Sequence, residues 1–429
     1  MPDRADRPAP GPARIRLIGE GAHAMMPPVQ TADAVVIGGG AFGAATAFHL
    51  ARRGAQVVLL DQHAMGSQTS ARAAGLTSQA ASWPVMAALR HEACVAFERF
   101  EAESGRSLDF HRSGSLKAAY TEAGEARLRA DLRVAERLGI EAALVSAAEA
   151  ERLAPHFKAG AARAIGHVPS DGWLEPSRVA VGFAGRAAEL GARLSPFTRV
   201  TGLRRDGARV TGVATSRGDI AAPVVVDAAG GWTRAIAAAA GIPLPLVTVR
   251  HQLYITEPIA GVAPLQPIVR LLEASVYVRY ADGGLMFGGY EDAPEVIRPE
   301  TLPPGFQVAD LALDLGVLRA LTDEVGAHFP ALGRGRIAVH RGGLPTMTPD
   351  GHPILGAVPG AEGFYVASGC CVGGLSLSPA AGRALADLVL DGKSEPDLAP
   401  LSVTRFGGWT EGPDLDAACV ERYARKYMK

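Results

Sequence analysis

The stretch DAVVIGGGAFGAATAFHLARRGAQVVLLD, residues 33–61, decides the fold. It opens with a short apolar run from Ala34 to Ile37 that is typical of a buried strand, and an alanine-rich segment that favours a helix follows as far as Arg53. A second apolar run, Val57 to Leu60, predicts another strand. Strand, glycine-rich loop, helix and strand in this order predict a parallel βαβ unit that binds a dinucleotide.

The loop between the first strand and the helix has the pattern G-x-G-x-x-G. Gly38 allows a tight turn, Gly40 lets the backbone approach a pyrophosphate, and Gly43 lets the helix pack closely on the strand. The helix N-terminus offers free N–H groups and a positive dipole end to the phosphates. Asp61, at the end of the second strand, is placed to accept a hydrogen bond from a ribose 2′-hydroxyl, which argues against NADP. The motif alone leaves NAD and FAD open.

Length and composition exclude several classes of protein. A chain of 429 residues is long enough for two sizeable lobes. Its 43 Lys and Arg residues nearly balance 44 Asp and Glu residues, so its charge gives no reason to expect a nucleic-acid partner. The four cysteines make no C-x-x-C pair and no metal-ligand spacing, so we expect no metal and a reducing, cytoplasmic setting.

The first thirty residues hold six prolines and no apolar run of signal-peptide length. We expect residues 1–30 to be disordered, or to precede a true start at Met25 or Met26. The only membrane-like run, residues 34–51, belongs to the predicted dinucleotide unit, so no membrane span is expected.

Beyond residue 61 the chain resembles the D-amino-acid oxidase-like (DAO) family of FAD-dependent amine and amino-acid oxidoreductases, the group of sarcosine oxidase, glycine oxidase and dimethylglycine dehydrogenase. The resemblance extends from residue 33 to about residue 400. Besides the dinucleotide motif, six blocks carry it in the family's order: GSQTSARAAGL (66–76), DGWLEPSRV (171–179), VVVDAAGGWTRAI (224–236), VYVRYADGGLMFGGYE (276–291), GGLPTMTPDGHPILG (342–356) and FYVASGCCVGGLSLSPAAGRALADLVLDG (364–392).

This resemblance implies an α/β fold with a discontinuous, Rossmann-like FAD-binding domain and a second α+β substrate domain whose mixed sheet roofs the flavin. We expect residues 31–112, 160–246 and 335–400 in the FAD-binding domain, and residues 113–159 and 247–334 in the substrate domain. Residues 401–429 are expected as a C-terminal tail ending in a short basic helix that docks on the body or on a partner.

Carried over by position, the family's cofactor-binding residues fall along the whole chain. The resemblance assigns this role to Gly38, Gly40, Phe42, Gly43, Asp61, Gln62, Thr69, Ser70, Ala74, Gly75, Leu76, Val200, Ala229, Gly230, Trp232, Gly343, Gly374, Leu375 and Ser376. Some relatives tether FAD through a histidine at the position of Arg72, and others through a cysteine at the position of Gly343. Neither residue present here forms such a bond, so we predict non-covalent FAD.

Two adjacent cysteines, Cys370 and Cys371, interrupt the glycines of GCCVGG, residues 369–374. Vicinal cysteines do not form an unstrained disulfide, and no neighbouring His or Cys completes a metal set. We predict a packing role for both, with a redox-sensitive thiol as the alternative.

The segment 276–291 predicts a β-hairpin that turns at residues 282–284. Tyr277 falls where amino-acid oxidases hold the substrate carboxylate, and Arg279 lies on the same face of the strand. These two residues are the predicted catalytic pair. The family's carboxylate-binding arginine and lysine fall at Pro345 and Ser376. This argues against a simple glycine-like or sarcosine-like substrate, or requires another clamp such as Arg250, Arg279 or Arg341. An oxygen-activating lysine that some but not all of the family's oxidases have falls at Met286, which favours a dehydrogenase.

Two helices are expected outside these blocks. Residues 122–140 place Leu128, Leu132, Ala135 and Leu138 on one face and stop at Gly139. Residues 378–392 read as an amphipathic helix entered through Pro379.

The resemblance implies FAD-dependent oxidation of the C–N bond of a secondary or tertiary amine or an amino acid, with hydride transfer to flavin N5. The expected partners are a small amine, like sarcosine, dimethylglycine or a D-amino acid, and either O₂ or an electron-transfer partner. A heteromeric assembly stays open. Two alternatives also stay open: a flavoenzyme that oxidises a C–O bond, and a non-catalytic FAD-holding regulatory subunit.

Overall fold

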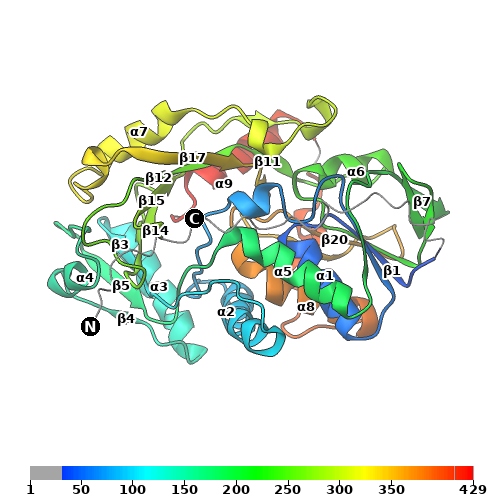
Figure 1. Cartoon of the computed structure of the whole chain (residues 1–429), viewed down its shortest axis with the longest axis horizontal. Coiled ribbons are helices and arrows are strands. Elements are labelled where there is room, and N and C mark those ends of the chain that lie inside the picture. The colour runs from blue at the N-terminus through cyan, green and yellow to red at the C-terminus, as the bar shows by residue number, and fades with distance from the viewer. Residues whose placement is uncertain (1–30, 410, 429) are drawn as a thin grey trace, which may run out of the picture.

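The computed structural model describes residues 31–409 and 411–428, so the expectation for residues 1–30 lies outside the described residues. Two lobes lie side by side, each built on its own large sheet (Figure 1). We call them the cofactor lobe, which holds β1, and the roof lobe, which holds β14.

The predicted βαβ unit forms the centre of the cofactor lobe. Strand β1 (Ala34–Ile37) leads through the glycine loop into α1 (Ala41–Arg52) and returns as β2 (Val57–Leu60). Both strands are fully buried and pair in parallel, as the continuous apolar runs predict.

Four more strands complete this sheet, in the order β19-β20-β10-β1-β2-β6. They come from distant parts of the chain, and only β19 runs antiparallel to its neighbour. Their bounds are β6 Arg193–Ser195, β10 Val224–Asp227, β19 Ile354–Ala357 and β20 Phe364–Ser368.

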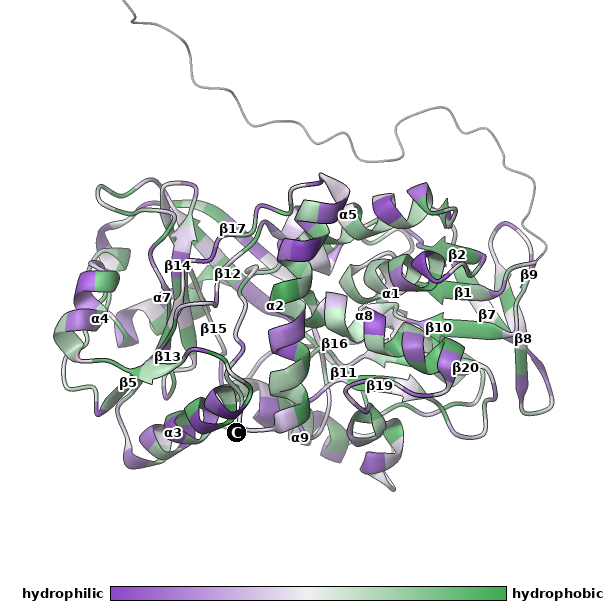
Figure 2. Ribbon diagram, turned by 90° about the horizontal axis from the view of Figure 1, so that it is seen from below, coloured by the Kyte–Doolittle hydropathy of each residue, from purple (hydrophilic) through white to green (hydrophobic). Residues whose placement is uncertain are grey.

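Helices cover one face of this sheet, and a small sheet with a short helix lies towards the other (Figures 1 and 2). The helical face buries the apolar sides of α1, α2, α5 and α8 in one core. Their bounds are α2 Pro84–Ser104, α5 Pro176–Glu189 and α8 Gly374–Asp391. The other face carries β7 Val200–Asp206, β8 Arg209–Thr215, β9 Ile220–Ala221 and α6 Thr233–Ala239.

The roof lobe is an eight-stranded mixed sheet in the order β17-β12-β15-β14-β13-β3-β5-β4. Helices α3 (Glu122–Arg137), α4 (Ala147–Leu153) and α7 (Leu315–Glu324) belong to this lobe (Figure 1). The strand bounds are β3 Ser115–Ala119, β4 Ala143–Leu144, β5 Ala164–Val168, β12 His251–Thr256, β13 Ile268–Leu271, β14 Val276–Ala281, β15 Gly284–Gly289 and β17 Ile337–Gly343.

Sheet membership differs from two expected domain boundaries. Strands β5 and β17 pair within the roof lobe, although residues 160–246 and 335–400 were both expected in the FAD-binding domain. Their partners, β3 and β12, lie tens of residues away in sequence, so local pattern did not reveal the pairing.

Three local expectations can be compared with the helices and strands. The hairpin is confirmed as β14 and β15 with a turn at Asp282 and Gly283. Helix α3 is present, but Leu138 is its C-cap and is 37% exposed, so it does not share the buried positions of Leu128 and Ala135. Helix α8 begins at Gly374 and contains Pro379, so its predicted start near residue 378 is wrong.

The tail docks on the body. Helix α9 (Pro413–Ala424) packs on β11 (Val247–Val249) and β18 (Thr346–Met347), which form a small sheet with β16 (Val296–Ile297). Leu415, Cys419 and Tyr423 of α9 are buried in this contact. Within residues 31–409 and 411–428, no helix has the length and apolar character needed to cross a bilayer.

The glycine at position 43 carries the first prediction. A Cβ added there would lie 1.8 Å from the carbonyl oxygen of Gly38, so Gly43→Ala must push α1 away from β1. We expect a loss of about 3 kcal/mol in the free energy of unfolding, at the upper end for overpacking, together with loss of bound FAD. Urea unfolding and the flavin content of the purified protein measure both.

The matched control is Gly333→Ala, at an exposed glycine in a short 3-10 helix, Leu332–Arg334, where an added Cβ meets no atom within 4 Å. Equal stability and flavin content in the two variants would contradict the predicted contact.

Candidate active site

A single cavity of about 750 Å³ runs from the glycine loop of the cofactor lobe to the sheet of the roof lobe. Its wall includes every predicted cofactor-binding residue except Gly43, which packs on Gly38. Tyr277 lines the same cavity, whereas Arg279 does not. Segments more than 300 residues apart in sequence therefore meet at one site.

The dinucleotide end of the cavity is built around Asp61. One carboxylate oxygen accepts the backbone N–H of Gly39 at 2.8 Å, and the other accepts that of His63 at 2.7 Å. Burial raises the pKa of Asp61 to about 6, against the two hydrogen bonds that lower it. Gly38 has φ +101°, a left-handed conformation that fits the tight turn expected of it.

Beyond the glycine loop, the 3-10 helix Thr69–Arg72 connects both lobes. The hydroxyl of Ser70 accepts the N–H of Ala41 at the start of α1, at 3.0 Å. The hydroxyl of Thr69 accepts the N–H of Leu344, also at 3.0 Å. This segment ties the phosphate-binding end of α1 to the loop that follows β17.

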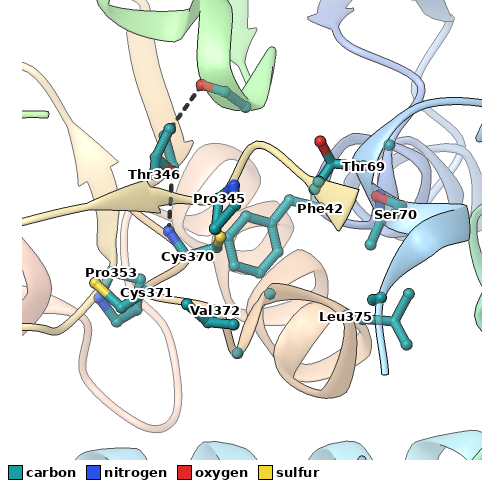
Figure 3. Close-up of a pocket in the computed structure, with 18 of the residues that line it drawn as sticks. Phe42, Thr69, Ser70, Pro345, Thr346, Pro353, Cys370, Cys371, Val372 and Leu375 are labelled. Atoms are coloured by element: carbon teal, nitrogen blue, oxygen red, sulfur yellow. Dashed lines mark hydrogen bonds between the residues drawn. The ribbon is translucent and has the colours of Figure 1, made fainter. Parts of the chain in front are cut away.

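The GCCVGG loop forms another part of the wall (Figure 3). The N–H of Cys370 donates to the Thr346 hydroxyl at 3.2 Å, and the N–H of Cys371 donates to the Thr346 carbonyl at 2.8 Å. Cys371 and Val372 have φ +44° and +64°, a strained conformation for such residues.

Both thiols of this loop are free, and burial raises the pKa of Cys371. Cys371 is fully packed, in line with the predicted packing role, whereas Cys370 is only half-buried and faces the cavity next to Phe42. The loop leads directly into the N-terminus of α8, which aims its first residues at the cavity.

The roof end of the cavity centres on Tyr277, which is only 2% exposed. Its hydroxyl lies 3.1 Å from Nε2 of His251, and Nδ1 of His251 lies 2.7 Å from the hydroxyl of Tyr423 in α9. Burial lowers the pKa of His251 to about 4, so the ring is neutral at physiological pH. A neutral ring has one N–H, so it donates to one tyrosine and accepts from the other.

Arg279 is not brought to this end of the cavity. Its guanidinium donates to the carbonyls of Ala74 and Tyr280 and lies 4.7 Å from the ring centre of Trp173, beside a separate small hollow. Among the other proposed clamps, Arg250 is paired with Glu295, and only Arg341 reaches the cavity.

The residues present fit FAD. The cavity joins a dinucleotide loop, an acidic ribose acceptor and a helix N-terminus to a closed end under a second sheet, within one continuous space. Glycine residues stand where side chains would fill this space or displace its wall, as at Gly38, where a Cβ would meet the Ala228 carbonyl oxygen at 2.4 Å.

Comparison with known proteins agrees with this geometry. The profile of the family described as FAD dependent oxidoreductase (DAO) matches residues 33–388. The chain belongs to the DAO family of FAD-dependent oxidoreductases.

Among relatives, human mitochondrial sarcosine dehydrogenase is 31% identical over 93% of this chain and 44% of its own length. Mouse mitochondrial dimethylglycine dehydrogenase is 29% identical over 91% and 46%. The crystal structure of L-proline dehydrogenase from P. horikoshii aligns with a TM-score of 0.80 at 26% identity, over 88% of this chain and 98% of that one. The chain spans a little under half the length of these two curated relatives.

The DAO-family site also contains residues that the sequence analysis missed. His251 was assigned no role in the site from the sequence, and Tyr423 was placed only in the C-terminal tail. The cavity is further lined by Tyr290, Tyr427, Arg90, Lys117, Arg127, Arg270 and Lys426. Strand pairing and tail docking bring these residues together, and no local spacing in the sequence signals either.

The raised pKa of Asp61 makes the stability of the FAD-free protein depend on pH. The folded protein holds this proton up to about pH 6, whereas the unfolded chain releases it near 3.8. Folding therefore binds a proton between these values, and stability falls as pH rises through them, by at most about 1.4 kcal/mol per pH unit. Buried Asp227, with its pKa raised to about 7, acts in the same direction.

Asparagine does not titrate, so Asp61→Asn should remove the part of this loss of stability that Asp61 causes. We expect the free energy of unfolding of the variant to rise relative to that of the wild type between pH 4 and pH 6. Urea unfolding of the FAD-free protein at both pH values measures the difference. Asp206→Asn, at an exposed position on β7, is the control and should follow the wild type. An Asp61→Asn variant that keeps the wild-type slope would refute the assignment.

Proposed function

We propose that the chain oxidises the C–N bond of a secondary or tertiary amine or an amino acid. The observation that carries this proposal is the continuity of one cavity from the dinucleotide loop to a closed end under the roof sheet, where Tyr277 and the neutral His251 lie. When bound, FAD supplies the hydride acceptor. The carbon next to the amine nitrogen loses its hydride, and water then hydrolyses the resulting imine.

The chain's own residues orient the amine and keep the site dry. Tyr277 offers its hydroxyl to the substrate carboxylate, and the hydrogen bond from His251 holds that hydroxyl in place. Tyr423 fixes the other nitrogen of the imidazole, so α9 positions the histidine from outside the roof sheet. Hydride loss requires a neutral amine, and the buried position of the site beside Tyr277 disfavours the ammonium form.

For the electron acceptor we propose a partner other than O₂. Met286 of β15 is fully buried beside Leu253 and Ile255, at the position where some but not all oxidases of the family have an oxygen-activating lysine. We also propose a cytoplasmic setting, which the four free cysteines support.

The proposal is tested on the purified, flavin-loaded protein under anaerobic conditions. N-methyl amino acids, N,N-dimethylglycine and D-amino acids are added one at a time, and the oxidised flavin absorbance is recorded. We expect at least one amine to bleach it, and admitted air to restore it slowly. Bleaching by a hydroxy acid alone would identify a C–O oxidising enzyme, and no bleaching by either class would favour a regulatory subunit.

Tyr277→Phe removes the hydroxyl without changing the ring. A hydrogen bond to a charged group contributes about 1.5–3 kcal/mol, so we expect KM for the amine found above to rise about 10- to 100-fold. Tyr365→Phe on β20, outside the cavity, is the control and should behave as the wild type. An unchanged KM in Tyr277→Phe would remove this residue from the substrate site.

We propose that FAD is held without a covalent bond. The side chain of Arg72 donates to the Gly342 carbonyl at 2.7 Å, and Gly343 has no side chain, so neither position offers a nucleophile. Denaturation in acid should release all the flavin into the supernatant. Flavin that stays with the polypeptide would refute this, and its absence from a Cys370→Ser variant would identify the attachment point.

A further inference from the structure

A row of three large side chains crosses the roof sheet beside the candidate active site. Tyr277 of β14 is paired with Arg270 of β13, and Arg270 is paired with Lys117 of β3. Directly paired residues project from the same face of a sheet, and all three line the cavity. Neighbouring strands lie about 4.8 Å apart, so Arg270 and Lys117 stand one and two strand widths from Tyr277.

The Tyr277 ring leans away from this row. It lies over Gly288 on the opposite strand, where an added Cβ would come within 2.2 Å of the tyrosine oxygen. The space above Arg270 therefore belongs to the cavity. Arg270 is 3% exposed, and one of its terminal nitrogens donates to the Thr77 carbonyl at 2.8 Å. The other makes no hydrogen bond to the described residues, although the side chain of Tyr427 lies within reach of the same guanidinium.

Three more cations complete what we call the cationic end of the cavity: Arg90 of α2, Arg127 of α3 and Lys426, which follows α9. In Figure 2, α2 lies between the two lobes, and α3 and the C-terminal end lie near its lower end. Within residues 31–409 and 411–428, Arg90 and Lys426 make no hydrogen bond or ion pair. Burial lowers the pKa of both.

Two carboxylates stand against these five cations. Asp131 of α3 accepts from Lys117 at 3.1 Å and from Arg127 at 3.2 Å. Asp171 lies outside the cavity wall and accepts from the Ser115 hydroxyl at 2.5 Å and the Gln79 N–H at 2.8 Å. The cationic end thus carries an excess of positive charge, with Arg270 and Lys117 buried and with Arg90, Arg127 and Lys426 half-buried. The desolvation cost falls in full only on the buried cations.

We infer that the cationic end binds a second carboxylate of the substrate, so that the substrate is an amino acid with an acidic side chain. The identity of this ligand as an amine rests on the proposed function, whereas the cationic end itself does not. Positions roughly 5–10 Å from Tyr277 suit a side chain of the length found in aspartate or glutamate. The excess positive charge also disfavours the ammonium form of the amine, which must be neutral to lose a hydride.

The test compares N-methylglutamate with N-methylglutamine, which has the same size but lacks the charge, on the full-length flavin-loaded protein. We expect the ratio of their kcat/KM values to be at least tenfold in favour of N-methylglutamate. Glutarate and butyrate serve as non-reacting probes, and we expect glutarate alone to perturb the flavin spectrum and raise the Tm.

Arg90→Met and Arg270→Met are expected to lower the charge preference at least tenfold and to weaken glutarate binding by the same factor. Arg133→Met is the matched control, because Arg133 is exposed and lies on α3, the helix that also carries Arg127. This variant should keep both the charge preference and the affinity for glutarate. Arg90 is only half-buried, so this variant keeps the test decisive if Arg270→Met does not fold.

Two outcomes separate this inference from the proposed function. Flavin reduction by N-methylglutamine as efficient as by N-methylglutamate, with no glutarate binding, would overturn the inference and leave amine oxidation intact. Glutarate binding that depends on Arg90 and Arg270, in a protein whose flavin no amine reduces, would support the anion site and overturn the proposed function.

Discussion

The close crossing of α1 over β1 is the contact on which the rest of the site depends. Because Gly43 has no side chain, α1 lies against the Gly38 carbonyl. The N-terminus of α1 lies at the edge of the sheet formed by the carboxyl ends of the parallel strands. Strands β1, β2, β10 and β20 all finish at this edge, and the loops that follow them line the cavity. Ligands of open parallel sheets bind at such an edge. Segments that are distant in sequence converge there because parallel pairing aligns the ends of their strands.

Helices and strands that have a local sequence pattern of their own could be predicted from the sequence. The βαβ unit and the hairpin each have an apolar pattern with its own turn residues, and both lie where expected. The start of α8 could not be predicted, because proline is over-represented at the first position of helices and Pro379 therefore pointed to a later start. Here the proline stands inside the helix, where it supplies no N–H to the Leu375 carbonyl, and the Ser378 hydroxyl donates to that carbonyl instead, at 2.9 Å.

The substrate end of the cavity shows why the other site residues could not be predicted from the sequence. Alternation along β14 places Tyr277 and Arg279 on one face of the strand. Residues i and i+2 of a strand are about 6.8 Å apart, however, and the loop at Ala74 covers Arg279. The nearer neighbours of Tyr277 lie across the sheet. They are Arg270 and Gly288, and their register depends on strand pairing over the whole lobe. The cation beside the tyrosine is therefore Arg270, which no spacing within residues 276–291 could indicate.

Closure by the C-terminal segment links the two kinds of polar group in the cavity. Helix α9 buries Tyr423 against His251, and the residues after it bring Lys426 and Tyr427 to the wall. The loss of water keeps His251 neutral, and it raises the desolvation cost of the buried Arg270 guanidinium, one of whose terminal nitrogens has no hydrogen-bond partner among the described residues. The binding of an anionic ligand offsets this cost, because an anion in the same low-dielectric space interacts with such cations far more strongly than in water. The arrangement is then consistent around Tyr277: the neutral His251 holds its hydroxyl, and the charged end beside it keeps cations that Asp131 does not pair.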